Sequence, residues 1–153
     1  MVDSRGARIS PAQTRRKFRT LQSMSWADRA LVTEAAVMLV AARATLAILP
    51  FRWFEPWLSL NRAEDASNTT LVARVRRAVN IASRNLPLKV ACLPQAMAAK
   101  VMLARRGTRS SLWIGAARAD DGEMILHAWL EAGGTIVTGE AGQAGVTPVA
   151  RFG

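Results

Sequence analysis

The 153-residue chain has one cysteine, one histidine and no tyrosine. A single cysteine, Cys92, excludes an internal disulfide framework and fits a reducing compartment such as the cytoplasm. Cys92 and the one histidine, His127, are too few for a structural zinc site, so we expect neither a metal nor another cofactor. The chain also lacks a glycine-rich phosphate-binding loop, and its first apolar run starts only near Ala30, so no signal peptide is expected.

Acidic residues are missing from a central stretch of the chain, between Ala66 and Ala119. Ten basic residues fall there: Arg74, Arg76, Arg77, Arg84, Lys89, Lys100, Arg105, Arg106, Arg109 and Arg118. With a formal net charge of +10, this half should carry a positive field that steers nucleic acid, a membrane surface or an acidic peptide. The alternative is a solvated basic face that only keeps the protein soluble.

The first third of the chain predicts one long apolar helix. Residues 1–24 are polar and basic and indicate a mobile start or a short amphipathic helix. Ser25 is a typical N-cap, and Pro50 should stop the helix after about Leu49. The helix approaches the length of a membrane span, but Glu34 and Arg43 interrupt it, which favours a buried core helix over a membrane-surface helix.

The next segments predict a linker and a second helix. The aromatic cluster at residues 51–57 is typical of a core, and could also line a peptide groove or lie at a membrane interface. The composition turns polar over residues 61–68. Thr69 or Thr70 can cap an amphipathic helix from Leu71 to about Ser83. We therefore divide the chain into an N-terminal helical segment, residues 1–67, for leader or partner docking, and a core, residues 68–153.

The second half of the chain changes to the period of β-strands. Residues 110–118, 124–131 and 135–138 alternate as strands do, and turns at 120–122 and at Gly133-Gly134 join them. These features predict a three-stranded antiparallel meander. Helices followed by strands give an α+β fold.

Cys92 lies where a helix should begin. Pro94 suits the first turn of a helix, and Gly107 suits its C-terminal end. Unpaired backbone N–H groups at a helix start favour a thiolate and can donate hydrogen bonds to an oxyanion. A buried structural cysteine is the alternative. Gln95, one turn on, could contact a substrate carbonyl or be an ordinary exposed residue.

His127 shares one face of its strand with Ile125, Trp129 and Glu131, because side chains alternate along a strand. A two-residue turn at Gly133-Gly134 would set His127 opposite Glu140. A carboxylate there would hold the imidazole tautomer, the third role in a catalytic triad. A longer loop would shift this register, which leaves Glu131 as the second candidate.

Four segments together resemble the leader peptidases, or B proteins, of lasso-peptide biosynthesis, which belong to the transglutaminase-like superfamily. They are Cys92-Leu93-Pro94, Leu103-Ala104-Arg105-Arg106-Gly107, Trp113-Ile114-Gly115-Ala116, and His127-Ala128-Trp129-Leu130-Glu131 before Gly133-Gly134. The resemblance covers Leu86 to Glu140, and the last string is shared across the wider superfamily. It implies a transglutaminase-like or papain-like cysteine peptidase core with a cysteine on a helix and a histidine on an antiparallel sheet.

By this resemblance Cys92 is the nucleophile and His127 the general base and acid. The family usually has an aspartate about a dozen residues after the histidine, where this chain has Gly139 and Glu140. Glu140 is therefore the candidate third catalytic residue. We expect the substrate to contact Gln95, Trp113, Trp129 and Glu131.

The resemblance also implies partners. The substrate would be the leader region of a precursor peptide, and a separate cyclase of the asparagine-synthetase type would close the ring afterwards. At this length we expect a stand-alone cytoplasmic peptidase that needs a separate leader-recognition protein, and no nucleic acid. Two alternatives stay open: a transglutaminase-like acyltransferase with the same residues, and a non-enzymatic basic module that binds nucleic acid or an acidic partner.

Overall fold

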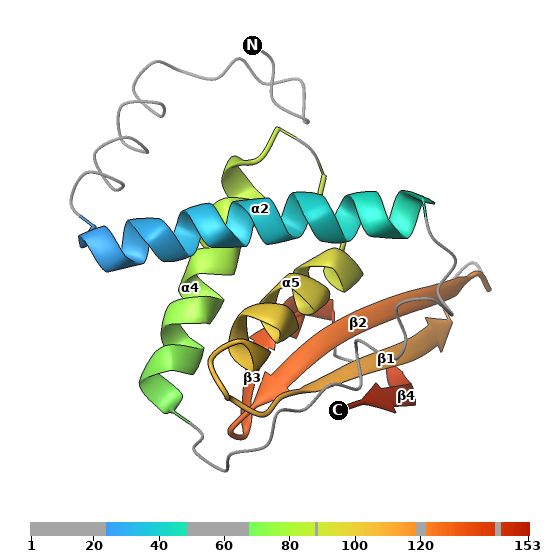
Figure 1. Cartoon of the computed structure of the whole chain (residues 1–153). Helices are drawn as coiled ribbons and strands as arrows, with labels where there is room; N and C mark the ends of the chain where they lie inside the picture. The colour runs from blue at the N-terminus through green and yellow to red at the C-terminus, as the bar shows by residue number, and fades with distance from the viewer. Residues whose placement is uncertain (1–23, 49–67, 88, 119–121, 143–144) are drawn as a thin grey trace. The chain divides into compact units, whose positions relative to one another are not determined.

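The computed structural model describes residues 24–48, 68–87, 89–118, 122–142 and 145–153. Within these ranges the fold is α+β, as predicted, with three helices on one side of a four-stranded antiparallel sheet (Figure 1). The predicted basic start, the stop at Pro50, the aromatic cluster at 51–57 and the linker at 61–67 lie outside the described residues.

Helix α2 runs from Trp26 to Ile48 and begins as predicted. The backbone N–H of Asp28 donates to Ser25 Oγ at 3.1 Å, and the Ser25 hydroxyl donates to the Asp28 carboxylate at 2.7 Å. These reciprocal bonds satisfy a backbone donor that a helix start leaves without an intrahelical partner. Contacts divide the chain after Ala30, so the first residues of α2 belong to an N-terminal unit and the rest to the second unit.

From Leu31 onward, one stripe of α2 lies in the core of the second unit. The buried residues are Leu31, Ala35, Leu39 and Ala42. Both interrupting charges have partners: Glu34 pairs with Arg105 and Arg106, and Arg43 donates to the carbonyl of Lys89 at 3.2 Å. By length and composition alone α2 is able to cross a membrane, and much of its apolar surface is exposed.

Helix α4 runs from Thr69 to Asn85 and starts two residues earlier than predicted. Its N-cap is Asn68, whose side-chain oxygen accepts the N–H of Leu71 at 3.0 Å, so neither Thr69 nor Thr70 is the cap. Asparagine is a stronger N-cap residue than threonine, and here its side-chain oxygen accepts the N–H of the third helical residue. The buried face of α4 consists of Val72, Val75, Ala78, Val79 and Ala82.

Helix α5 runs from Cys92 to Ala104, and the three predicted strands follow: β1 (Ser111–Arg118), β2 (Met124–Ala132) and β3 (Thr135–Thr138). A fourth strand, β4 (Thr147–Phe152), was not predicted. The sheet order is β3-β2-β1-β4, so the meander is correct and β4 adds an edge beside β1. Pro148 is tolerated there because an edge strand can do without one N–H.

The two faces of the sheet differ. Leu112, Leu130, Ala132 and Val137 belong to the same apolar core as the helices. The opposite face carries residues that alternate with these along β1 and β2, including Trp113, His127, Trp129 and Glu131. We call the first the helix-covered face and the second the tryptophan face.

Candidate functional site

Cys92 is the first residue of α5 and is half-buried. The N-cap residue, Ala91, makes no side-chain capping hydrogen bond, and Pro94 is buried in the first turn. The side-chain amide of Gln95 donates to the carbonyl of Val90 at 2.9 Å, so Gln95 fixes the segment that leads into Cys92. The predicted helix start at the thiol is therefore confirmed, and its first backbone N–H groups have no side-chain cap among the described residues.

His127 lies on β2 with a fixed ring. Its Nε2–H donates to the backbone carbonyl of Gly139 at 2.6 Å. Because a carbonyl only accepts, Nε2 carries the proton and Nδ1 is the acceptor of the neutral ring, with no hydrogen bond to it among the described residues. The imidazole also stacks near Trp129, with ring centroids 6.2 Å apart and planes 17° from parallel. A main-chain oxygen thus holds the tautomer, the role that the sequence analysis gave to a carboxylate.

Two glycines fit closely around this ring. A Cβ on Gly142 would lie 2.5 to 2.8 Å from three atoms of the His127 imidazole. A Cβ on Gly139 would lie 2.5 Å from the carbonyl oxygen of Ala128, and Gly139 has φ +85. Both positions therefore need glycine, Gly142 for space and Gly139 for space and conformation. The sequence analysis missed Gly142, because nothing in its spacing shows that it meets the histidine.

The predicted pairing of His127 with Glu140 is wrong. Strands β2 and β3 begin in the expected register, with Ala132 opposite Thr135 and Glu131 opposite Ile136. One step further, Leu130 lies opposite Thr138, so Val137 is an extra residue and forms a β-bulge. The bulge shifts everything beyond it by one residue.

The carboxylate of Glu140 instead forms an ion pair with Arg76 of α4. Glu140 begins the short 3-10 helix η2 (Glu140–Gly142), and no hydrogen bond joins it to His127 among the described residues. The second candidate, Glu131, lies on the same face of β2 as His127 but four residues further along the strand. The structure thus gives His127 a backbone carbonyl as its partner.

Cys92 and His127 come from two layers of the fold. Ala128, Leu130 and Ala132 alternate with His127 along β2, and Leu130 and Ala132 lie in the core with α5, so His127 lies on the tryptophan face. Within the described residues no hydrogen bond joins the thiol to the imidazole. Their joint role in catalysis stays a prediction.

Four side chains form a row across the tryptophan face. Trp129 stacks on Trp113, directly opposite on β1, with centroids 6.1 Å apart and planes 8° from parallel. The Arg151 guanidinium of β4 lies over the Trp113 ring, 5.0 Å from its centroid. With His127 at the other end, the row runs His127–Trp129–Trp113–Arg151. Trp129 is only 3 % exposed, so it forms part of the site's floor.

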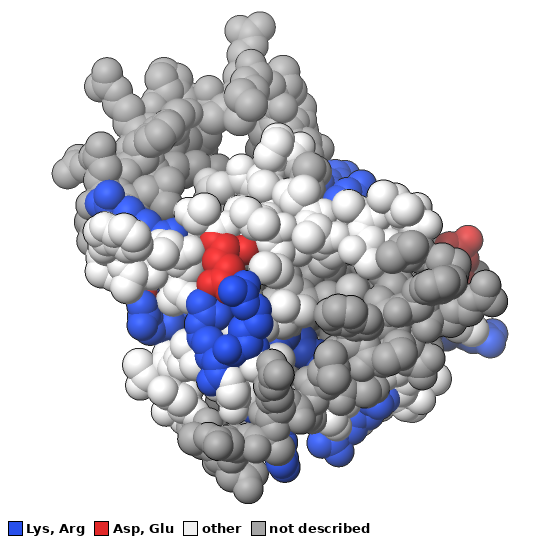
Figure 2. Space-filling view, in the orientation of Figure 1, with Lys and Arg blue, Asp and Glu red and all other residues white. Residues whose placement is uncertain are grey.

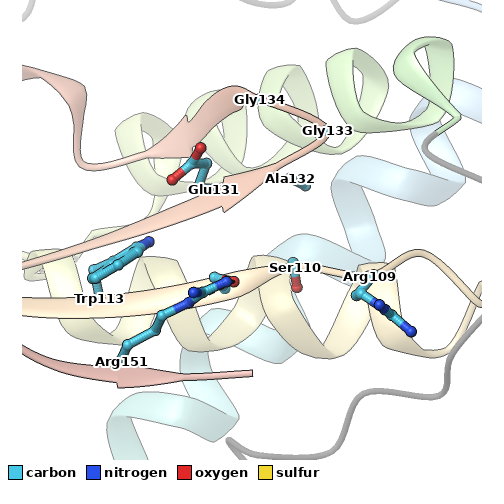
Figure 3. A pocket seen from close by; sticks show the side chains of 9 residues that line it. Arg109, Ser110, Trp113, Glu131, Ala132, Gly133, Gly134 and Arg151 are labelled. Carbon is cyan, nitrogen blue, oxygen red and sulfur yellow. Dashed lines mark hydrogen bonds between the residues drawn. The ribbon is translucent and has the colours of Figure 1, made fainter. Parts of the chain in front are cut away.

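A hollow of about 520 Å³ lies at the arginine end of this row. Its lining residues are Arg109, Ser110, Ser111, Trp113, Glu131, Ala132, Gly133, Gly134 and Arg151 (Figure 3). It brings together two predicted substrate contacts, Trp113 and Glu131. It also includes Arg109 and Arg151, which the sequence analysis did not single out for binding. Arg151 could have been identified from the sequence only if β4, the strand that places it over Trp113, had been predicted.

Lys100 is a buried cation that the sequence analysis counted only as part of the basic stretch. It is 2 % exposed, and its ammonium donates to the carbonyls of Ser110 at 2.8 Å and Phe152 at 3.3 Å. Burial lowers its pKa to about 8. Lys100 thereby ties α5 to the start of β1 and the end of β4, beside the hollow.

Figure 2 shows basic side chains at several places on the surface; an acidic group near the centre of the view borders on basic side chains, and another acidic group lies at the right edge. The ion pairs of Glu34 with Arg105 and Arg106 join α2 to the turn after α5.

The described residues contain no group of three or more histidine, cysteine, aspartate or glutamate side chains that could hold a metal ion.

The chain matches the family model of the transglutaminase-like superfamily over residues 36–151. This match covers more than half of the chain and includes both Cys92 and His127, so the protein belongs to the transglutaminase-like superfamily. No curated protein and no solved structure gives a significant match to it. The family assignment supports a catalytic role of the coarse cysteine-peptidase or acyltransferase type.

Proposed function

We propose that this protein is a cysteine peptidase that removes the leader from a ribosomally made precursor peptide of the lasso type. One observation carries the proposal. In a chain of the transglutaminase-like superfamily, the only thiol lies at an uncapped helix start, and the only imidazole is held in the tautomer whose Nδ1 can accept a proton. These are the two groups that a thiol peptidase needs.

In the proposed reaction, Nδ1 of His127 takes the thiol proton of Cys92. The sulfur attacks the carbonyl carbon at the leader–core junction and forms an S–C bond. Backbone N–H groups at the start of α5 donate to the oxyanion. The imidazolium then protonates the leaving nitrogen as the C–N bond breaks, which frees the amino terminus of the core. Water, deprotonated by His127, hydrolyses the thioester and releases the leader.

This mechanism requires the thiol and the imidazole to come within hydrogen-bond distance when substrate is bound. Catalytic hydrogen bonds are often long in the free enzyme and tighten in the substrate complex. The helix that begins with Cys92 packs on β2, the strand that carries His127, so the two groups belong to neighbouring elements. Gly142 and the carbonyl of Gly139 limit how far the ring can turn.

The proposal includes partners. A separate recognition protein delivers the leader in the cytoplasm, and a cyclase uses the freed core. The basic residues of α4 suit such docking, because Arg74, Arg77 and Arg84 are exposed and recur along one side of the helix.

The test is mass spectrometry of a candidate lasso-type precursor incubated with this protein and its recognition protein. Wild-type protein should release leader and core whose masses add up to the precursor plus one water. Cys92→Ala and His127→Ala should each lower the rate by about 10⁴-fold or more, with unchanged circular dichroism. Cys92→Ser is the matched control, because it keeps the size and polarity of the side chain but removes the thiol.

Three results would count against the proposal. Intact precursor in the presence of folded wild-type protein and partner would favour a non-enzymatic module. Cleavage that survives Cys92→Ala would remove the proposed nucleophile. A leader product that carries an added amine in place of water would make the protein an acyltransferase.

A further inference from the structure

Strand β2 is paired over its whole length on one side and over only part of it on the other. β1 pairs with β2 from Met124 to Glu131, whereas the pairing with β3 stops at Leu130. Beyond β3 the chain continues into η2. Residues 124–127 of β2 therefore have no neighbouring strand on the β3 side among the described residues. We call this open part of the sheet the β2 edge.

The β2 edge presents backbone hydrogen-bonding groups. A Cβ on Gly139, the residue after β3, would lie 2.5 Å from the carbonyl oxygen of Ala128, so this carbonyl points to the β3 side. Backbone groups of successive residues in an antiparallel strand point to opposite sides, so Met124 and Leu126 also direct N–H and C=O to the β3 side. Within the described residues these groups have no backbone hydrogen-bond partner.

The β2 edge also lacks the features that protect exposed strands. Proteins discourage pairing at a sheet edge with charged residues, proline, bulges or short strands. The edge strand β4 has Pro148 and Arg151, and the edge strand β3 is four residues long and bulged. The β2 edge has neither proline nor an ionised side chain, and its apolar residues are exposed: Met124 by 73 %, Ile125 by 50 % and Leu126 by 64 %. Such an edge is ready to pair with another strand.

We propose that the β2 edge binds the peptide substrate as an added β-strand. The peptide backbone exchanges hydrogen bonds with Met124 and Leu126, the binding mode known as β-augmentation. A peptide is the fitting occupant because the β2 edge includes His127 and continues to Gly139, whose carbonyl holds the imidazole. Helix α5, which begins with Cys92, packs on both β2 and β3. This inference rests on the proposed function for its substrate, a peptide, but the binding itself needs no catalysis.

The geometry of the added strand predicts which substrate residues matter. In a peptide that runs antiparallel to β2, as β3 does, the residue opposite Leu126 places its side chain beside that of Leu126 and turns its N–H and C=O toward β2. The next peptide residue turns its backbone groups away from β2. We therefore expect apolar residues at every second position of the bound peptide, and hydrogen bonds to β2 from the same positions.

The test uses full-length protein labelled with ¹⁵N-leucine and follows the backbone N–H resonance of Leu126, assigned by its loss in Leu126→Val. The probe is the peptide acetyl-Thr-Leu-Thr-Leu-Thr-amide. We expect it to shift this resonance saturably and to slow the hydrogen exchange of the Leu126 N–H. Two isomers of the probe give the matched comparison. N-methyl groups on both leucines should weaken binding about tenfold or more, and N-methyl groups on the last two threonines by less than about threefold.

A variant removes the hydrogen bond from the protein side. Leu126→Pro lacks the edge-facing N–H, and proline is tolerated where that N–H is not part of a ladder. Binding of a fluorescein-labelled probe, measured by anisotropy, should weaken about tenfold or more. Leu126→Val keeps the N–H and an apolar side chain, so it should bind within about threefold of wild type. Circular dichroism checks that both variants fold.

Four results would overturn the proposal. The two N-methyl isomers could bind equally well, or the probe could cause no shift at tens of millimolar. In free protein, exchange of the Leu126 N–H as slow as that of Leu130 would mean that the β2 edge is already paired. A Leu126 shift on dilution of the protein alone would assign the edge to a second copy of this chain. Since no cleavage is measured, these outcomes stand apart from the fate of the proposed peptidase activity.

Discussion

The two faces of the β-sheet use the same strands for different purposes. On the helix-covered face, Leu112 and Leu130 are fully buried in one apolar core with α5, and Thr138 opposite Leu130 has a buried hydroxyl without a partner among the described residues. On the tryptophan face, the neighbouring residues Trp113, Trp129 and Glu131 carry stacked aromatic rings and line a hollow, and the buried indole N–H of Trp113 has no partner within the part of the chain that the structure describes.

The difference shows where stability and where chemistry lie in this fold. A closely packed apolar face gains most from burial and tolerates little change. The tryptophan face instead carries aromatic and charged side chains beside a hollow, where a bound partner has room to make contact. Cys92 lies at the N-terminal end of α5 in the helix layer, whereas His127 lies on the tryptophan face of the sheet. The proposed function therefore depends on contact across the boundary between the layers.

Adjacent residues of β2 test this comparison with the largest expected change in stability. Leu130→Ala leaves a cavity on the helix-covered face and should lower the free energy of unfolding by about 2–5 kcal/mol. Glu131→Gln, one residue on and on the tryptophan face, should change it by less than about 1 kcal/mol. Urea denaturation measures both. Equal losses would mean that the two faces share one packed core.

Gly142→Ala probes the tryptophan face at the imidazole. The new Cβ would overlap three atoms of the His127 ring, and the backbone at this position suits alanine. We expect the cleavage rate to fall about 10- to 100-fold, because displacement of a catalytic group by about an ångström has that effect. Ala141→Gly, in the same short helix, adds no atom near the ring and serves as the control. Full activity in Gly142→Ala would show that the ring is free to move.

Lys100 extends the comparison to pH. Its pKa is lowered from 10.5 to about 8 by burial, so between these values the unfolded chain holds a proton that the folded chain has lost. The free energy of unfolding should therefore rise from about pH 8 to pH 10.5, by roughly 1–2 kcal/mol, and be lowest below pH 8. Denaturation at several pH values measures the rise. Lys100→Met should abolish it, and a rise that persists in this variant would assign it to another group.

Glu140→Gln tests the corrected register and has the smallest expected effect. The ion pair with Arg76 is largely exposed, so its loss should cost less than about 1 kcal/mol. Because Gly139 holds the imidazole through its carbonyl, cleavage should change by less than about threefold. A loss as large as that of His127→Ala would make Glu140 the third catalytic residue after all.

The fold was largely predictable from local patterns. The period-two alternation located β1, β2 and β3 to within a residue, and Ser25 and Pro94 marked helix starts correctly. Strand β4 was not predicted, because six residues that include a proline show too weak an alternation of apolar and polar side chains. The N-cap of α4 was assigned to Thr69 or Thr70, whereas the structure has Asn68 there.

The site was less predictable, because it depends on contacts between distant residues. The residue types at Cys92 and His127 indicated the chemistry. The bulge at Val137 moved Glu140 away from the imidazole, and a bulge depends on packing that one strand's sequence does not show. The close fit of Gly142 and the place of Arg151 over Trp113 likewise arise only when the chain folds.

The central claim is that Cys92 and His127 meet. It is best tested by placing a second cysteine at position 127 and asking whether a disulfide forms with Cys92. Because Cys92 is the only native cysteine, His127→Cys contains two thiols and no others. A disulfide forms only if the two Cα atoms can come within about 7 Å. Intact-mass measurement after mild oxidation with bound precursor should show loss of two hydrogens in His127→Cys and not in Ile125→Cys, two residues away on the same face. If both thiols of folded His127→Cys stay free and react with alkylating reagent, the two groups do not meet and the account is contradicted.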